Sequence, residues 1–514
     1  MIGAMSTDRK KQFMMNSFSG LLVQIITAGV GAFLIPYMTK YLGDQGFGIY
    51  QMSYAVLMIV MFLNLGMGPA MVRFFSKSIA ENNVSDLKKI ASTGQLCLGG
   101  TGLVAALIIA GIAPFFANFY GIAPEFARDS ALLLLCLSVV IFLNFETLVF
   151  RGCIVGNNRY DLVNAIDMIT QLLRLGLIVV FFETGYASIV SVGMAMICSQ
   201  LFQTSLIIFF SYVYVGKSIV FSLRNVNGQI FYEMFSIGFL SLISTISFAV
   251  SIQVPQLVIG KTLGPEMVAA FAPTILVANA LAGFIIQLSC PLAPVASRDI
   301  AETGGKNLGR WVILLSQFIS CIAGICILPF LVYSPEILAL WLGPEKSWLA
   351  PHLAIIVFGV VYSQVQSVIY YLALGSKSIA PTTYSALAMA IAIVFGVFWG
   401  TYVGSWNLLD VVIFMTLIKM IRSIIYLPFA YTKQFNYGYM TFLNQVFLKP
   451  GVLLISVALL TWGIKIMLPN NLLFYIVGGI CMLMIYCIAC WVLLMNRKIK
   501  EYYFYAQEKK RVSF

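Results

Sequence analysis

Long apolar runs separated by short polar connections make up most of this chain. A membrane-spanning helix needs about 20 mostly apolar residues, with a working range of roughly 17 to 25. Read with a window of that length, the sequence predicts fourteen such helices. Their expected bounds are 13–38, 47–72, 90–118, 128–150, 161–182, 188–215, 233–259, 267–290, 309–332, 351–374, 380–403, 408–431, 447–468 and 472–495. Because the connections are mostly short, we expect no separate soluble domain.

The distribution of Lys and Arg orients these helices, because cytoplasmic connections carry an excess of positive charge. With the N-terminus in the cytoplasm, 23 of the 31 Lys and Arg residues fall on the cytoplasmic side. Five fall on the opposite side, namely Lys40, Arg128, Lys261, Lys346 and Lys465. The other three lie inside predicted helices. We therefore expect a multi-pass membrane protein with both termini in the cytoplasm.

The composition agrees with lipid as the main solvent. Apolar residues make up 61% of the 514 positions and charged residues only 10%, with a mean hydropathy of +0.94. The net charge of +12 comes from basic residues that lie between apolar runs, so we expect no nucleic-acid partner. The ten Cys residues mostly occur singly in apolar runs, which predicts neither a disulfide framework nor a metal site or other cofactor. Residues 497–514 alternate basic and aromatic side chains, a composition suited to a cytoplasmic tail on an anionic membrane surface.

One face of the predicted helix 161–182 is polar. Asn164, Asp167, Gln171 and Arg174 follow one another at steps of three, four and three residues, so they share an arc of about 80°. Charged groups inside a membrane are costly and usually face an internal cavity. Asp167 and Arg174 are about 10.5 Å apart along the helix axis, which is too far for a direct pair. We expect this face to line a cavity.

Two further predicted helices carry polar residues on one side. Lys419 and Arg422 lie near the middle of helix 408–431. Helix 351–374 carries Ser363, Gln366 and Tyr370 on one face, and these three side chains are candidate cavity lining. The common alternative use of such residues is hydrogen bonding between helices.

Three cations at membrane depth exceed what the nearby acids, Asp167 and Glu146, can pair. Arg174, Lys419 and Arg422 are therefore expected to face a water-filled, net-cationic cavity. Such a cavity attracts anions, and guanidinium groups bind phosphate with two parallel hydrogen bonds. The sequence favours a phosphate or diphosphate group as the ligand.

A glycine-rich motif and a weaker second copy of it connect this chain to a known family. The first copy is Leu42-Gly43-x-x-Gly46-x-Gly48-Ile-Tyr50, followed by Gly66 and Arg73, and the echo is Leu263-Gly264 after Pro255. In this motif and in its number of spans, the chain resembles the polysaccharide transporter family. That family contains the O-antigen (Wzx-type) flippases of the multidrug/oligosaccharidyl-lipid/polysaccharide exporter superfamily.

The resemblance implies an all-α polytopic fold of the MATE-like flippase type, with about 14 transmembrane helices. It implies two six-helix lobes related by a pseudo-two-fold axis and two additional helices. The expected boundaries are 1–220 for the N-terminal lobe, 221–435 for the C-terminal lobe, 436–496 for the additional helices and 497–514 for the tail.

The resemblance also implies a function without covalent chemistry, so no enzyme activity is expected. The chain would move a polyprenyl-diphosphate-linked oligosaccharide from the cytoplasmic to the outer leaflet by alternating access, in polysaccharide, O-antigen or lipopolysaccharide biosynthesis. The implied location is the cytoplasmic (inner) membrane of a bacterium or archaeon. The implied partners are this lipid-linked oligosaccharide, membrane lipids, and a glycan polymerase and glycosyltransferases of the same pathway. Arg174, Lys419 and Arg422 match the cationic lumen of such families in character.

Three other functions stay open. An ion-coupled exporter of cationic drugs would need acids at its binding site, and the predicted helix 13–38 contains none. A glycan polymerase or ligase would carry a sizeable extracytoplasmic loop, whereas the outer connections here are short. A flippase of the peptidoglycan precursor would differ only in substrate.

For energy coupling, Glu146 and Asp167 are candidate sites for a proton or sodium ion, and a local hydrogen-bonding role is the alternative for both.

Overall fold

The computed structural model describes residues 7–64, 66–290, 292–303, 308–376, 378–467 and 471–495. Within these ranges every regular element is a helix. The predicted tail, 497–514, lies outside the described residues. The chain divides into two compact units, which are treated separately below: the first unit contains Met1–Leu276 and Ala386–Leu408, and the second contains Val277–Ser385 and Leu409–Phe514. The lobe boundaries expected from the sequence stay a prediction.

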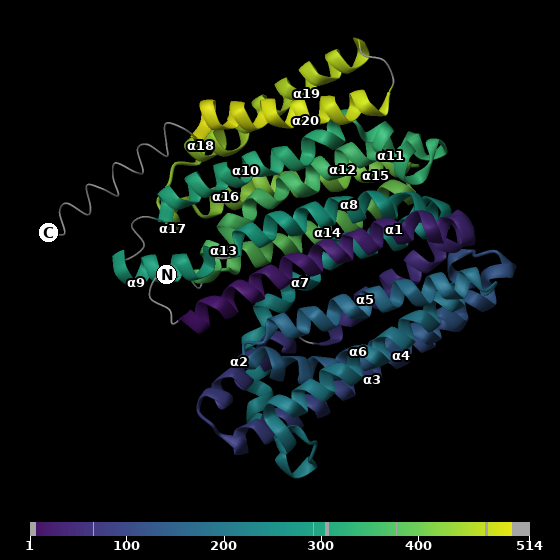
Figure 1. Cartoon of the computed structure of the whole chain (residues 1–514), viewed down its shortest axis with the longest axis vertical. Coiled ribbons are helices and arrows are strands. Elements are labelled where there is room, and N and C mark those ends of the chain that lie inside the picture. Colours follow the sequence, from purple (N-terminus) through teal and green to yellow (C-terminus); the bar gives the residue numbers. More distant parts are fainter. Residues whose placement is uncertain are drawn as a thin grey trace. The chain divides into compact units, whose positions relative to one another are not determined.

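The first unit is a bundle of long helices (Figure 1). In chain order it contains α1 (Thr7–Val60), η2 (Met61–Asn64), α2 (Met67–Ala80), α3 (Val84–Tyr120), α4 (Pro124–Gly156), α5 (Tyr160–Glu183), α6 (Ile189–Val215), η3 (Gly216–Ile219), η4 (Leu223–Asn225), α7 (Gly228–Thr262), α8 (Pro265–Ser289) up to Leu276, and α14 (Ala380–Tyr402) from Ala386. Helix α4 packs against both α3 and α6, and α5 packs between α1 and α6.

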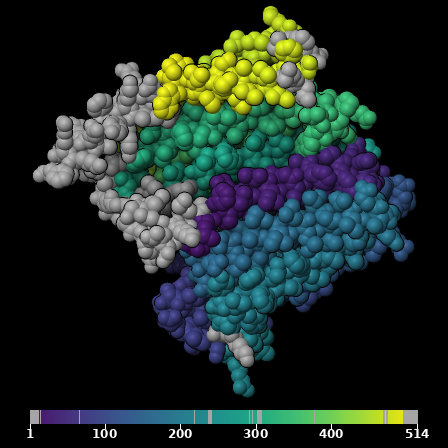
Figure 2. Space-filling view, viewed as in Figure 1, coloured from purple at the N-terminus to yellow at the C-terminus, as the bar shows by residue number. Residues whose placement is uncertain are grey.

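The second unit is built from shorter and more interrupted helices. It contains the end of α8, α9 (Leu292–Thr303), α10 (Leu308–Val332), α11 (Ser334–Leu342), η5 (Pro344–Leu349), α12 (Ala350–Ser363), η6 (Gln364–Gln366), α13 (Ser367–Gly375), the start of α14, α15 (Leu408–Met420), η7 (Ile421–Tyr426), α16 (Leu427–Ala430), α17 (Thr432–Phe435), α18 (Tyr439–Phe442), η8 (Leu443–Leu448), α19 (Lys449–Met467), α20 (Leu472–Ala489) and η9 (Cys490–Met495). Helices α19 and α20 pack against α10 and form a surface of this unit, drawn in yellow in Figure 2.

Helix α1 is two membrane crossings joined at Gly43. A straight helix of its 54 residues would be about 81 Å long, whereas a bilayer core is about 30 Å thick. The hydroxyls of Tyr37 and Tyr41 contact Glu183 at the end of α5, yet Tyr50 lies within electrostatic range of Arg174, nine residues earlier on α5. The chain therefore reverses at Gly43. Its φ of 69° and ψ of 171° fall in a region that only glycine occupies readily, so Gly43 permits the turn.

The chain is a multi-pass membrane protein. Among the described residues, twelve helices are long and apolar enough to cross a membrane, and they include Phe18–Asn64 as one segment. Dividing that segment at Gly43 adds a crossing. The continuous run of α15, η7 and α16, from Leu408 to Ala430, adds another. These observations are consistent with the fourteen predicted spans.

Close helix packing and lipid-facing side chains explain why the bundle of the first unit forms. A Cβ atom at Gly102 of α3 would lie 2.8 Å from the Cβ of Phe145 on α4, so the missing side chain allows the two backbones to approach. On the other side of α3, Leu103 and Leu107 are more than half exposed, as expected of residues that face acyl chains.

Candidate functional site

Among the described residues, Arg422 of the second unit is bound only by neutral oxygens. Its Nε donates a hydrogen bond to Ser385 Oγ at 3.1 Å, and its Nη1 donates to Gln366 Oε1 at 2.9 Å. Its Nη2 donates to the backbone carbonyl of Thr382 at 3.2 Å. A guanidinium has five N–H donors. The three acceptors orient the group and leave its charge uncompensated.

The backbone on both sides of this contact departs from α-helical geometry. Arg422 lies in the π-helical segment η7, which joins α15 to α16. Opposite it, the 3₁₀ segment η6 separates α12 from α13 and contains Gln366. Ser423 Oγ donates to the backbone carbonyl of Ser363 at 2.7 Å and ties the two segments together. π-Helical turns inside α-helices frequently mark functional sites.

Lys419 lies one turn before Arg422 and is only 6% exposed. Within the part of the chain that the structure describes, its ammonium makes no hydrogen bond and no ion pair. A buried ammonium without a partner is costly in a low-dielectric environment. Lys419 and Arg422 together therefore form a cationic cluster that lacks a counter-charge among the described residues.

The polar residues predicted on helix 351–374 have different roles. Gln366 is a direct partner of Arg422. The buried Ser363 hydroxyl donates to the carbonyl of Val360 in its own helix, at 2.8 Å, so its hydrogen-bond donor is used within that helix. Tyr370 is half-buried and packs edge-on against Tyr371, with ring centroids 5.2 Å apart. Only one of the three predicted lining residues thus contacts a cation.

In the first unit, Arg174 of α5 resembles Arg422 in having only neutral partners. Its Nε donates to Ser199 Oγ of α6 at 3.2 Å, and the rings of Tyr50 and Tyr54 lie within electrostatic range. It makes no ion pair with any residue in the described ranges. Four of its five N–H donors remain available for a ligand or water.

Asp167, in contrast, is neutralised by a residue that sequence reasoning missed. Arg151 of α4 donates to both Asp167 oxygens, from Nη1 at 3.0 Å and from Nη2 at 2.5 Å. Gln203 of α6 donates to Oδ1 at 2.8 Å. The predicted helix 128–150 places Arg151 just outside the membrane, among the cytoplasmic basic residues, whereas α4 continues to Gly156. The sequence signal for this ion pair is that Arg151 and Asp167 lie on either side of one short polar turn, so that they come from two consecutive helices.

The remaining predicted residues of the first unit make no hydrogen bond with one another among the described contacts. Asn164 donates from Nδ2 to Ser19 Oγ of α1 at 2.9 Å. Gln171 is half-buried and makes no hydrogen bond with the described residues. Glu146 of α4 is partly buried against Gly99 of α3 and likewise has no hydrogen-bond partner in the described ranges. The polar face of α5 is therefore shared among several neighbouring helices.

A second ion pair, between Arg159 and Asp161, lies where the chain passes from α4 to α5. Arg159 donates from Nε to Asp161 Oδ1 at 3.0 Å and also bonds the hydroxyl of Tyr214. The hydrogen bonds to Asp161 raise the pKa of the Arg159 guanidinium. Among the residues described, no group of three or more His, Cys, Asp or Glu side chains is placed to hold a metal ion. The cationic groups are thus the distinctive chemistry of the two units.

Comparison with known proteins identifies the family and the fold. A family of polysaccharide biosynthesis proteins matches residues 13–298. The uncharacterized membrane protein EpsK of Bacillus subtilis is 21% identical over 351 residues, which are 67% of this chain and 68% of EpsK. An inward closed structure of the lipid II flippase MurJ superposes with a TM-score of 0.69 at 15% identity, over 93% of this chain and 99% of MurJ.

An inward-facing multidrug resistance transporter of the MATE family, in the MOP superfamily, superposes with a TM-score of 0.62 at 15% identity. The superposition covers 81% of this chain and 98% of the transporter. These likenesses confirm the expected MATE-like flippase fold. Since the family match covers more than half of its length, the chain belongs to the family of polysaccharide biosynthesis proteins.

Proposed function

We propose that this protein is a flippase that moves a polyprenyl-diphosphate-linked oligosaccharide from the cytoplasmic to the outer leaflet by alternating access. The observation that carries the proposal is the cluster of Lys419 and Arg422, two cations inside a membrane-spanning run without a carboxylate partner in the described ranges. A buried, uncompensated positive charge favours an anionic ligand.

A diphosphate fits the donors that this cluster offers. Arg422 uses three of its five N–H groups on neutral acceptors, so two remain for a phosphate oxygen. The Lys419 ammonium adds three more donors and a compact charge. Arg174 offers the same chemistry in the first unit. We propose that all three bind the diphosphate at some stage of transport, and that Asn164, Gln171, Ser363, Gln366 and Tyr370 line the path of the sugar.

The family supports a glycan as the cargo. Its members are polysaccharide biosynthesis proteins, and the solved structures that share the fold are titled as a flippase and as transporters. A peptidoglycan-precursor flippase is a second candidate, supported by the match to nearly the full length of a lipid II flippase. An exporter of cationic drugs has less support, because three cations at membrane depth, Arg174, Lys419 and Arg422, have no ion-pair partner among the described residues.

The cellular setting is part of the proposal. The excess of basic residues on one side supports a cytoplasmic membrane, with both termini in the cytoplasm. A flippase of this kind would receive its substrate from glycosyltransferases and deliver it to a glycan polymerase. For energy coupling we favour Glu146 over Asp167, because Asp167 is held by Arg151 whereas Glu146 has no partner among the described residues.

The test is complementation of a strain that lacks the protein. Replacing Arg174, Lys419 or Arg422 by Ala should abolish the surface glycan while the protein reaches the membrane at normal levels. Lys433→Ala is the matched control, since this cation is exposed and lies only eleven residues after Arg422. Normal surface glycan in all three Ala variants would refute the proposal.

A further inference from the structure

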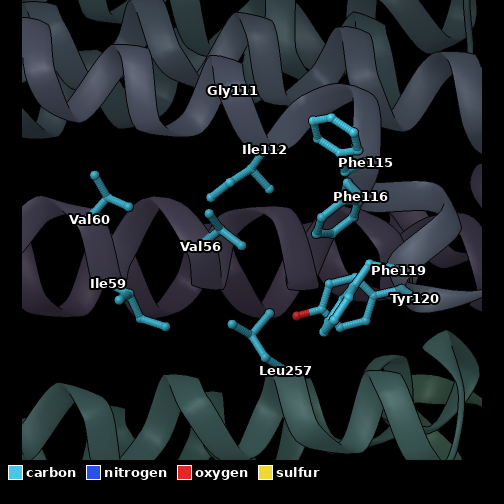
Figure 3. A pocket seen from close by; sticks show the side chains of 10 residues that line it. All are labelled: Val56, Ile59, Val60, Gly111, Ile112, Phe115, Phe116, Phe119, Tyr120 and Leu257. Carbon is cyan, nitrogen blue, oxygen red and sulfur yellow. The ribbon is translucent and has the colours of Figure 1, made fainter.

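The first unit contains an apolar cavity of about 450 Å³ between α1, α3 and α7 (Figure 3). It is lined by Val56, Ile59, Val60, Gly111, Ile112, Phe115, Phe116, Phe119, Tyr120 and Leu257. The Tyr120 hydroxyl is the only polar side-chain atom that these ten residues contribute. The volume falls within the range of about 300 to 1,000 Å³ that is usual for ligand sites.

The chemistry of the lining excludes water as a stable occupant. A buried water molecule needs two to four polar partners, and apolar cavities without them stay dry. The Tyr120 hydroxyl offers one such partner. A hydrocarbon chain, in contrast, contacts the Val, Ile, Leu and Phe side chains without losing any hydrogen bond.

One wall of the cavity is accessible from outside the unit. Phe115 and Phe119 follow one another at one-turn spacing on α3 and are 67% and 59% exposed, whereas Phe116 and Val56 behind them are buried. In a membrane-spanning helix, exposed side chains of this kind face acyl chains. A chain from the surrounding bilayer therefore has a sideways route into the cavity.

A cation stands at one end of the cavity. Lys261 lies one turn after Leu257 on α7, so both side chains share a face of that helix. Its Nζ donates to the backbone carbonyl of Phe119 and lies 4.9 Å from the centre of the Phe119 ring. Lys261 makes no ion pair with the described residues. Two of its three N–H donors remain for an anion.

We propose that this cavity binds one acyl chain of an anionic phospholipid whose phosphate is held by Lys261. A phospholipid is the occupant we assign because it is the solvent of these helices, so its concentration at the opening exceeds that of any other hydrocarbon. Lys261 is one of the five basic residues on the side predicted to be extracytoplasmic, which assigns the lipid to the outer leaflet. The site does not depend on the transport function proposed above.

Gly111 provides a means to block the cavity without disturbing the bundle. A Cβ atom at this position meets no heavy atom within 4 Å, so the side chain of Gly111→Leu extends into the cavity. Gly100→Leu is the matched control: it lies on the same helix, its Cβ also meets nothing within 4 Å, and it does not line the cavity.

The experiment is native mass spectrometry of the full-length protein, purified in a non-ionic detergent and titrated with phosphatidylglycerol or phosphatidylcholine of the same chains. The unmodified protein and Gly100→Leu should retain phosphatidylglycerol in preference to phosphatidylcholine. Gly111→Leu should lose the bound lipid. Lys261→Gln should still bind both lipids, with a preference for phosphatidylglycerol that is about fivefold weaker, as expected for one Lys near a phosphate surface.

Photo-crosslinking of the unmodified protein gives a readout that does not depend on how a variant folds. Phosphatidylglycerol with a diazirine in one acyl chain should label peptides that contain residues 56–60, 111–120 and 257. Labelling confined to other helices would overturn the assigned site, as would wild-type lipid retention by Gly111→Leu. Equal binding of the two head groups would overturn the role of Lys261. Binding of a polyprenyl phosphate but not of phosphatidylglycerol would overturn the assigned occupant.

Discussion

The two units neutralise their membrane-depth cations in different ways. In the first unit, Arg151 forms a bidentate ion pair with Asp167, whereas Arg174 has no ion-pair partner among the described residues. In the second unit, Arg422 and Lys419 meet only neutral oxygens or no described partner at all. A guanidinium that is paired with a carboxylate is stabilised, whereas one held by neutral acceptors keeps its full charge for a ligand. We therefore propose a structural role for the pair in the first unit and a binding role for the cluster in the second.

Giving Arg422 a carboxylate partner should have the largest effect. Ser385→Asp places an acid next to the Nε of Arg422, where Ser385 Oγ now accepts at 3.1 Å. Two charges 4 Å apart interact by about 4 kcal/mol at a protein surface, enough to cancel the attraction for a diphosphate. We expect transport of the lipid-linked glycan to fall at least tenfold, without loss of thermal stability. Ser385→Asn, which adds no charge, is the control, and equal transport by the Asp and Asn variants would contradict the binding role.

Removing the carboxylate from the first unit should instead affect stability. Asp167→Asn leaves Arg151 without its partner, and the pair is partly exposed, with 35% and 17% of the two side chains accessible. We therefore expect a loss of about 1 to 3 kcal/mol in unfolding free energy, less than for a fully buried pair. Thermal unfolding in detergent measures this change. Arg151→Gln combined with Asp167→Asn should recover part of the loss, and strictly additive losses would show that the two residues do not interact.

The sequence alone predicts the positions of the helices better than it predicts their ends. Hydropathy places the helices closely: 309–332 was expected and α10 spans Leu308–Val332. It fails at the ends of helices that continue past a charge, as α4 does beyond 150. Because of this error, the sequence does not predict the ion pair between Arg151 and Asp167: Arg151 lies next to a predicted turn and is therefore assigned to the solvent.

Angular position predicts a shared face but not a shared partner. Asn164, Asp167 and Arg174 lie on one arc of α5, as expected, yet they contact α1, α4 and α6 respectively. The tertiary packing of neighbouring helices decides these contacts, and one sequence contains no direct signal for it. The sequence does not predict the π-helical segment that contains Arg422 either, because this segment depends on where one extra residue per turn is accommodated.

Energy coupling offers a third contrast, between the paired Asp167 and the unpaired Glu146. Glu146→Gln removes a carboxylate that has no described partner, so we expect transport into liposomes to lose its dependence on a pH gradient. Asp167→Asn should retain that dependence in the fraction of protein that folds. If gradient dependence is unchanged in both variants, neither carboxylate couples transport to the gradient.

The smallest expected effect comes from removing one hydrogen-bond acceptor of Arg422 while its charge is kept. Gln366→Leu removes one neutral acceptor, 2.9 Å from Nη1, and leaves the guanidinium charged. A hydrogen bond to a charged group contributes about 1.5 to 3 kcal/mol. Because water can replace part of this bond in the variant, the apparent affinity for the substrate should fall only about fivefold. Initial transport rates over a range of substrate concentrations measure this change. A loss as large as that in Ser385→Asp would indicate that orientation matters more than charge.

The most direct test is the binding of a short prenyl diphosphate, such as farnesyl diphosphate, to the purified full-length protein over a range of salt concentrations. A diphosphate-binding role of Lys419 and Arg422 predicts binding that weakens with salt, that falls at least tenfold in Lys419→Ala and in Arg422→Ala, and that is unchanged in Lys433→Ala. Binding that stays within twofold of the unmodified protein in both cluster variants would contradict it.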